Sequence, residues 1–205
     1  MALAGRVLPA AFLLASSPAA FALNPALDIS QYAHASWKYS DGFTKGDIHR
    51  MTQTSDGYLW LATGFGLYRF DGVKAVPWQS PPDQPLPSND VGQLLPAKDG
   101  TLWIGTRNGL ASWTSGKLTR YAELAGLQIS ALLEDREGSI WAGAYGLPAG
   151  RLCEIRKGNV RCHPEIVDLG LGVTGLHEDA KGDFWVGLNT GVWRWKPGPP
   201  ELRSV

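Results

Sequence analysis

A tryptophan returns four times along this chain, each time at the end of the same short pattern. The four copies are Gly57-Tyr58-Leu59-Trp60, Gly100-Thr101-Leu102-Trp103, Gly138-Ser139-Ile140-Trp141 and Gly182-Asp183-Phe184-Trp185. Their intervals of 43, 38 and 44 residues match the period of a four-stranded propeller blade and lie outside those of most helical and leucine-rich repeats. The repeat therefore predicts an all-β fold, a β-propeller with four repeats of four-stranded blades.

Each repeat is expected to place its innermost strand first, followed by the tryptophan strand, a Gly-Leu strand and an outer strand. The repeats cover about residues 44–80, 88–122, 127–164 and 171–205. The tryptophan strands, such as Leu102 to Gly105, are almost continuously apolar, which indicates burial on both faces. Packing between neighbouring blades explains this burial, so we expect the four repeat tryptophans to be structural rather than ligand-binding.

One further strand is expected at about residues 30–38, ahead of the first repeat. In a closed propeller such a strand commonly completes the last blade. Here residues 201–205 could supply the outer strand of the fourth repeat, and four blades would make the smallest kind of propeller ring. We therefore expect the chain to form an incomplete, open part of a larger, seven-bladed ring.

The first 22 residues have the pattern of a secretory signal peptide. Arg6 precedes an apolar stretch from Val7 to Ala15, and Ala20-Phe21-Ala22 provides a small-x-small cleavage site. The apolar stretch is shorter than the roughly 20 residues that a membrane-spanning helix needs. We expect residues 1–22 to be removed, leaving residues 23–205 as a bacterial periplasmic or secreted protein with no membrane span.

The two cysteines fit an oxidising compartment. If Lys157-Gly158 is a two-residue hairpin loop, then residue 156 pairs with 159 and Cys153 lies directly opposite Cys162. This would be a non-hydrogen-bonded pair with a Cα separation of about 4.5 Å, at the short end of disulfide geometry. We expect a Cys153–Cys162 disulfide; a pair of buried thiols is the alternative.

Composition and spacing exclude several functional classes. The formal net charge is zero and there is no basic run, so nucleic acid is not an expected partner. No Cys or His spacing resembles a metal site, and no cofactor is expected. His177 and Glu178 look like an acid–base pair, but adjacent residues of a strand point to opposite faces. No set of catalytic residues is predicted.

Several segments resemble the start of bacterial two-component regulator propeller proteins. They include Gln31 to Trp37, Gln53 to Thr63, and Gly66 to Val73, and the resemblance extends from about Leu27 to Pro197. The family motif Gly-Thr-x-x-Gly-Leu is present as Gly105 to Leu110. The third and fourth repeats depart from it, with Gly143-Ala144 and Gly187-Leu188 in place of Gly-Thr.

The resemblance implies a non-catalytic, periplasmic, ligand- or signal-sensing module of a two-component system, with any histidine kinase or cyclase output outside this chain. Its partner would be a small molecule or oligosaccharide, or a protein. Two alternatives stay open: a propeller enzyme, similar to streptogramin lyases or glycosidases, and a secreted protein-binding scaffold.

No individual ligand-binding residue is assigned, but two regions are candidates. His49, Arg50 and Gln93 lie on innermost strands, where they could contact a ligand in a central channel or simply form its solvated wall. The other region is one rim of the propeller, where irregular loops gather. It includes residues 77–87 and 145–149, Phe65, Arg107-Asn108 and Asn189-Thr190. Ser115 and Lys157 lie on the opposite rim, and changing them is expected to have no effect on binding at the rim that carries the irregular loops.

Overall fold

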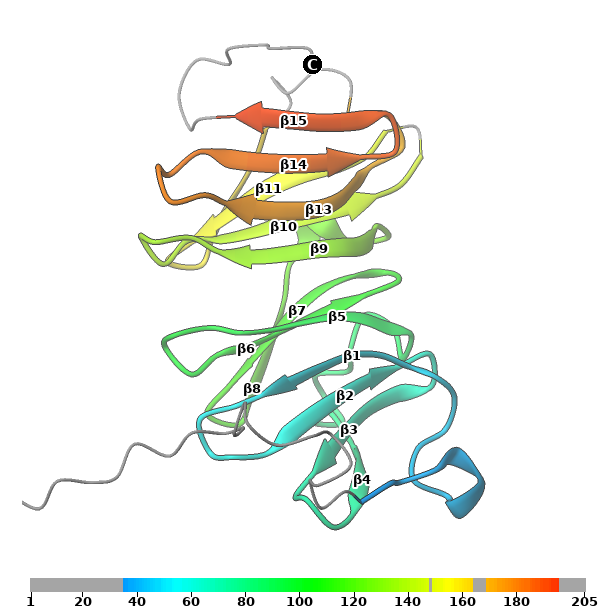
Figure 1. The fold of residues 1–205 in the computed structure, drawn as a ribbon. Coiled ribbons are helices and arrows are strands. Elements are labelled where there is room, and N and C mark those ends of the chain that lie inside the picture. The colour runs from blue at the N-terminus through cyan, green and yellow to red at the C-terminus, as the bar shows by residue number, and fades with distance from the viewer. Residues whose placement is uncertain (1–34, 148, 164–168, 196–205) are drawn as a thin grey trace, which may run out of the picture. The chain divides into compact units, whose positions relative to one another are not determined.

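The structure is a computed structural model that describes residues 35–147, 149–163 and 169–195. These residues form four antiparallel sheets that follow one another in chain order (Figure 1). We call them blades 1 to 4. Three have four strands and the fourth has three, and in each the strand order in space is the order in sequence. The expected all-β propeller architecture and its open ring are confirmed.

The strands lie close to the expected positions. Blade 1 consists of β1 (Ile48–Gln53), β2 (Leu59–Thr63), β3 (Gly66–Phe70) and β4 (Ala75–Trp78). Blade 2 consists of β5 (Val91–Pro96), β6 (Leu102–Thr106), β7 (Gly109–Thr114) and β8 (Lys117–Arg120). Blade 3 consists of β9 (Gln128–Glu134), β10 (Ile140–Tyr145), β11 (Arg151–Arg156) and β12 (Asn159–Cys162). Blade 4 consists of β13 (Val173–Glu178), β14 (Phe184–Leu188) and β15 (Gly191–Trp195). Two short 3-10 helices, η2 (Tyr39–Asp41) and η3 (Ala122–Leu124), lie in connections.

Some sequence expectations fall outside the described residues. These are the signal peptide at 1–22, the outer strand at 201–205 and most of the additional strand at 30–38. Residues 35–38, which are described, are not in a strand, so this part of the expectation is wrong. Trp37 instead packs edge-on against Phe70, with ring centroids 5.0 Å apart, and its Nε1 donates to the carbonyl of Val73. No helix among the described residues has the length and apolarity needed to cross a membrane.

Most of the hydrophobic core lies between blades, in three clusters that each join two neighbouring blades. Trp60 of blade 1 clusters with Val91 and Ile104 of blade 2, and Trp103 clusters with Ile140 of blade 3. Trp141 in turn clusters with blade 4. Each buried tryptophan therefore joins its own blade to the next one, which confirms the structural role expected for these three residues.

The middle strands show what a neighbouring blade does to burial. Every residue of β6 is buried, and β2 and β10 are buried except at one end. In β14 burial alternates, and Trp185 is only half-buried. Among the described residues no strand follows blade 4, and within them only one face of β14 is covered by a neighbouring blade.

Glycines in the tryptophan strands allow the blades to approach closely. A Cβ at Gly105 would lie 2.8 Å from Ile129 of blade 3, and a Cβ at Gly143 would lie 2.6 Å from Val173 of blade 4. Real Cβ contacts are longer than this. Glycine is therefore required at these positions by packing, not by backbone conformation.

One local expectation is wrong. Pro77 does not belong to the irregular loop expected at residues 77–87, because it pairs with Tyr68 inside β4; proline is tolerated there because β4 is an edge strand. The loop between β3 and β4 has four residues, more than a two-residue hairpin turn, since Phe70 pairs with Ala75. The Asp71 carboxylate accepts hydrogen bonds from the amides of Val73 and Lys74, which stabilises this longer loop.

The predicted register of the blade 3 hairpin is confirmed. Arg156 pairs with Asn159, and Cys153 lies opposite Cys162. Lys157 and Gly158 both have positive φ, 50° and 81°, as the tight hairpin turn requires. The two Sγ atoms are bonded in the structure, with a Cα separation of 3.9 Å, below the expected value.

We predict that this disulfide forms in the protein exported from the cell. Intact mass spectrometry under non-reducing conditions should give a mass lower by two hydrogen atoms than that of the reduced protein. Alkylation without reductant should modify neither Cys153 nor Cys162. Two thiols that alkylate freely in the unreduced, unfolded protein would show that the disulfide is not made.

Candidate functional site

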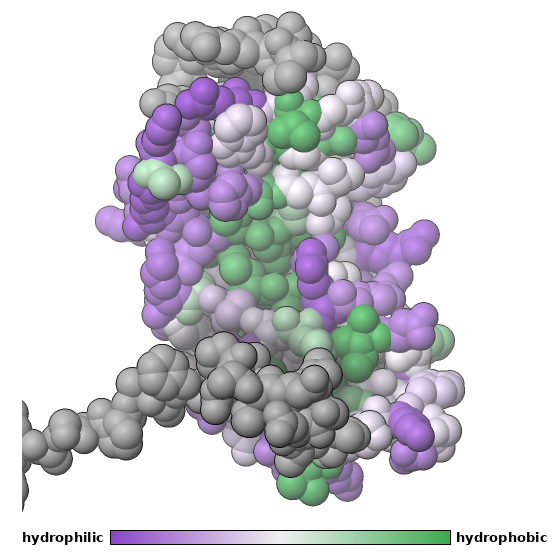
Figure 2. Space-filling view, viewed as in Figure 1, coloured by the Kyte–Doolittle hydropathy of each residue, from purple (hydrophilic) through white to green (hydrophobic). Residues whose placement is uncertain are grey.

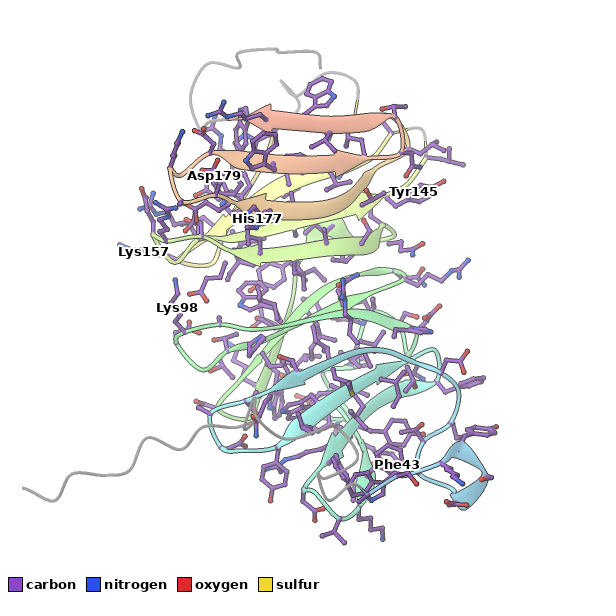
Figure 3. The ribbon with its side chains drawn as sticks, viewed as in Figure 1. Phe43, Lys98, Tyr145, Lys157, His177 and Asp179 are labelled. Carbon is purple, nitrogen blue, oxygen red and sulfur yellow. A yellow bond between two sulfur atoms is a disulfide. The ribbon has the colours of Figure 1, made fainter. Side chains whose placement is uncertain are left out.

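One rim of the array carries the irregular loops. The amide of Arg107, between β6 and β7, donates to the carbonyl of Asp90, and the amide of Gly126 donates to the carbonyl of Asn108. In blade 3 the amide of Gly146 donates to the carbonyl of Leu171. These bonds hold the loops between second and third strands beside the connections between blades. We call this edge the loop rim; Tyr145 marks it in Figure 3.

Buried threonines brace the loop rim in blades 1 and 2. The Thr63 hydroxyl donates to the carbonyl of Gly66 at 2.8 Å, and the Thr106 hydroxyl does the same to Gly109. Each hydroxyl also accepts a loop amide. This is the physical role of the threonine in Gly-Thr-x-x-Gly-Leu. Blade 3 has Ala144 at this position and a longer loop, so it lacks the brace.

Two hollows on the loop rim are both lined by Phe65, a residue that is 69% exposed. The larger has a volume of about 500 Å³ and is lined by Tyr68, Trp78 and Asn89 among others. The smaller, of about 370 Å³, is lined by Tyr39, Asp47 and His49. An exposed aromatic ring that lines two hollows is suited to stacking on a ligand.

The proline-rich connection forms part of the larger hollow. Trp78, at its start, is half-buried and packs edge-on against Trp60 and Trp113, with centroids 6.0 and 5.1 Å apart. The side chain of Gln84 accepts a hydrogen bond from the amide of Leu118 in β8. The connection is therefore fastened to both blades, and the hollow has fixed walls.

The candidate channel residues are engaged in bonds between blades. His49 Nδ1 lies 3.1 Å from the carbonyl oxygen of Val91. Arg50 Nε donates to Gln93 Oε1, and Gln93 Nε2 donates to the carbonyl of Ser130. Ser130 Oγ continues the series by donating to the carbonyl of Val173. The structure thus gives these side chains a role in fastening blades together.

A local irregularity explains these bonds. In every blade the pairing of the innermost strand with the tryptophan strand shifts at one residue, namely His49, Gly92, Ser130 and Thr174. Such a bulge bends the strand and re-aims a side chain. Single-sequence patterns do not reveal it, since the extra residue leaves no change in composition.

His177 and Glu178 do not act together. The Glu178 carboxylate accepts a hydrogen bond from the amide of Arg136 and pairs with its guanidinium at 3.1 Å, whereas His177 is exposed. Within the described ranges, no group of three or more His, Cys, Asp or Glu residues is arranged to hold a metal ion.

A further cavity, which the sequence pattern did not suggest, lies at the opposite edge between blades 2 and 3. This edge carries the turns that join the first strand to the second and the third strand to the fourth in a blade. We call it the turn rim; Lys98 and Lys157 lie there in Figure 3. The cavity has a volume of about 480 Å³. The signal that could have found it is Ala97, which stands where the other repeats have Thr54, Asp135 and Asp179.

These features define the class of protein: a β-propeller array with a loop rim and a turn rim. The sequence model of the two-component regulator propeller matches residues 85–108 and 123–146, within blades 2 and 3. The chain therefore carries repeats of the two-component regulator propeller family, as its motifs predicted. Comparison with functionally curated proteins finds no significant match.

Solved structures share the fold. The extracellular domain of a putative one-component system from B. thetaiotaomicron is 22% identical, with a TM-score of 0.60 over 75% of this chain and 21% of that chain. The extracellular domain of a putative hybrid two-component system from the same organism is 18% identical, with a TM-score of 0.51 over 77% and 30%. A catalytically inactive virginiamycin B lyase from Staphylococcus aureus is 17% identical, with a TM-score of 0.55 over 74% and 56%. The chain spans about a fifth of the first of these.

Proposed function

We propose that this chain is a non-catalytic, periplasmic sensing module of a two-component system, and that it binds its ligand on the loop rim. The family repeats support this proposal, as does the likeness to extracellular domains of sensor systems. It includes export by residues 1–22 and continuation of residues 23–205 into a larger ring. Any kinase or cyclase output would lie outside this chain.

The observation that carries the proposal is the arrangement around Phe65. A rigid array holds irregular loops on one rim, and one exposed aromatic residue lines two hollows there. Aromatic faces and polar groups such as the Asn89 side chain suit a sugar or a similar amphipathic small molecule. The ligand class we favour is therefore a small molecule or an oligosaccharide.

A propeller enzyme is the alternative that the lyase neighbours bring forward. Catalysis would need an acid or base that is free to reach a substrate. On the loop rim the His49 ring is hydrogen-bonded to a backbone carbonyl, and Arg107 pairs with Asp90 at 3.6 Å. These contacts favour binding over catalysis.

We predict that loop-rim substitutions weaken ligand binding while turn-rim substitutions do not. The full chain should be screened against neutral di- to hexasaccharides by thermal shift and calorimetry. For a saccharide that binds, changing Phe65, which lines both hollows, to Ala should weaken binding by about tenfold or more, the equivalent of one lost aromatic contact. Changing both Arg107 and Tyr145 to Ala tests whether the ligand also reaches the loop rim of blades 2 and 3. Ser115→Ala on the turn rim should leave the affinity unchanged.

Two outcomes would contradict the proposal. Conversion of a bound saccharide into a product by the purified chain would establish an enzyme. Loss of binding in Ser115→Ala together with normal binding in Phe65→Ala would show that the ligand binds on the turn rim and not on the loop rim.

A further inference from the structure

One of the residues that line the cavity on the turn rim carries a buried hydrogen-bond donor with no acceptor. Trp103 is 7% exposed and lines the cavity, and its Nε1 has no hydrogen-bond partner among the described residues. Buried polar groups are nearly always paired, because an unpaired one forfeits its hydration without compensation. The missing partner calls for an explanation.

In the other three repeats a side-chain oxygen accepts the hydrogen bond of the tryptophan indole. Trp60 Nε1 donates to Thr54 Oγ1 at 2.9 Å, Trp141 Nε1 donates to Asp135 Oδ2 at 2.9 Å, and Trp185 Nε1 donates to Asp179 Oδ2 at 3.0 Å. In each case the acceptor lies six residues before the tryptophan. Blade 2 has Ala97 at this position, and Ala97 also lines the cavity. Blade 2 therefore lacks the side-chain oxygen that accepts the indole hydrogen bond in the other three blades.

The neighbouring turn residue does not replace it. In blade 2 the Asp99 carboxylate accepts a hydrogen bond from the amide of Thr101 at 2.9 Å. The equivalent amide in blade 3, that of Ser139, donates to Asp135. Asp99 thus satisfies the backbone donor of the turn and leaves the indole donor of Trp103 unmet.

Two charged residues at the cavity have no ion-pair partner among the described residues: Asp99, whose carboxylate accepts the amide of Thr101, and Lys157. Lys98 lies 4.0 Å from Glu134, Arg136 pairs with Glu178, and Glu137 pairs with Arg156. Lys157 lines the cavity from the turn of the blade 3 hairpin and has no ion-pair partner among the described residues. Figure 2 shows hydrophilic residues gathered along this edge.

The inner walls of the cavity are apolar. Trp103 stacks on Tyr121 with centroids 5.2 Å apart, and Ile140 and Ile155 of blade 3 complete the lining. The Tyr121 hydroxyl is already hydrogen-bonded to Ser112. The cavity therefore offers an indole donor, one unpaired ammonium group and an apolar wall.

We propose that this cavity binds a small carboxylate with a compact apolar body, whose carboxylate takes the place of the aspartate that blade 2 lacks. One carboxylate oxygen accepts the hydrogen bond of Trp103 Nε1, and the charge faces the ammonium group of Lys157. The apolar body lies against Ile140 and Ile155. The volume, about 480 Å³, is in the range of small-molecule sites.

In blade 4 the acceptor of the indole hydrogen bond is an ionised carboxylate. The hydrogen bond from Trp185 Nε1, followed by those from the amides of Asp183 and Lys181 and by the charge of Arg194, lowers the pKa of Asp179 to about 2. The indole donor is the largest of these causes. A carboxylate that reaches Trp103 meets the same donor.

The proposed site lies on the turn rim and is independent of ligand binding at the loop rim. Lys157, expected from the sequence to be silent for the loop rim, has a separate role here.

The test uses benzoate, with benzamide as a neutral control of the same shape. In ¹H–¹⁵N spectra of the full chain, benzoate should shift the indole N–H signal of Trp103 saturably, toward the positions of Trp141 and Trp185. Benzamide should bind about tenfold more weakly or not at all, because it lacks the charge that strengthens the hydrogen bond.

Two kinds of variant separate the parts of the site. Ala97→Asp should supply the missing acceptor from the chain itself, shift the Trp103 signal without ligand and abolish benzoate binding. Ala97→Thr, which copies blade 1, should act in the same way if the aspartate is poorly tolerated. Lys157→Gln should weaken benzoate binding about tenfold and leave benzamide binding unchanged. Ser115→Ala, in the equivalent turn of blade 2, should change the affinity for neither compound.

Three results would overturn the proposal. One is equal affinity for benzoate and benzamide, and another is an absence of any Trp103 signal shift up to the solubility limit of benzoate. The third is unaltered benzoate binding by folded Ala97→Asp or Ala97→Thr. None of these results bears on saccharide binding at the loop rim, so the two proposals fail separately.

Discussion

Replacing Trp141 by Ala should lower the free energy of unfolding by about 3–5 kcal/mol, the usual cost of truncating a large buried aromatic side chain. Trp141 is 2% exposed and packs against Phe184 and Trp195 of blade 4. Its Nε1 also donates to the buried Asp135 carboxylate, so the substitution leaves both a cavity and an unpaired acceptor. Urea denaturation of the full chain, followed by circular dichroism, measures the change.

Trp185→Ala provides the matched control, because it removes the same repeat residue from blade 4. Trp185 is half-buried and its indole N–H is paired with Asp179, so its loss should cost clearly less than that of Trp141. Equal effects of the two substitutions would mean that packing between blades 3 and 4 is not the reason why Trp141 contributes to the free energy of unfolding.

Replacing Gly143 by Val should destabilise the protein toward the upper end of the about 1–3 kcal/mol typical of overpacking. The new Cβ would lie 2.6 Å from Cγ1 and 2.7 Å from Cβ of Val173, and 3.3 Å from Cβ of Ala131. A β-branched neighbour cannot rotate away without moving its backbone. Blades 3 and 4 would have to separate, and the midpoint of thermal unfolding should fall.

Gly175→Val is the control for backbone effects. Gly175 lies in β13, and a Cβ there would have no heavy atom within 4 Å. Valine favours strands, so this substitution should be neutral or slightly stabilising. If both variants lost stability equally, the close approach of the blades would not be the reason for glycine at position 143.

The strands were predictable from the sequence because the period of the repeat is strong. The tryptophan strand expected from Leu102 to Gly105, for example, is observed as β6 at Leu102–Thr106. The register of the blade 3 hairpin also followed from one turn, since Lys157-Gly158 allows only one pairing of Cys153 and Cys162. Pro77 was misplaced, because whether a proline is tolerated depends on which strand lies at the edge.

The candidate sites were less predictable. His49, Arg50 and Gln93 were expected near a channel, and the structure places their polar groups in bonds between blades. These bonds depend on a bulge in each innermost strand, and a bulge is a property of paired strands. Ala97 was overlooked for a similar reason, because an alanine in a turn carries no signal until the indole opposite it is seen to lack an acceptor.

The sequence by itself determined the fold class, the number of repeats described here, the order of strands within a blade and the relation to two-component regulator propellers. These follow from spacing, turn residues and apolar runs, which act locally along the chain. Only the tertiary structure decided which side chains meet across blades, among them Gly143 with Val173 and Trp103 with the cavity beside Ala97. Such contacts join residues from different repeats, and their geometry is fixed by the packing of whole blades rather than by the residues near them in sequence.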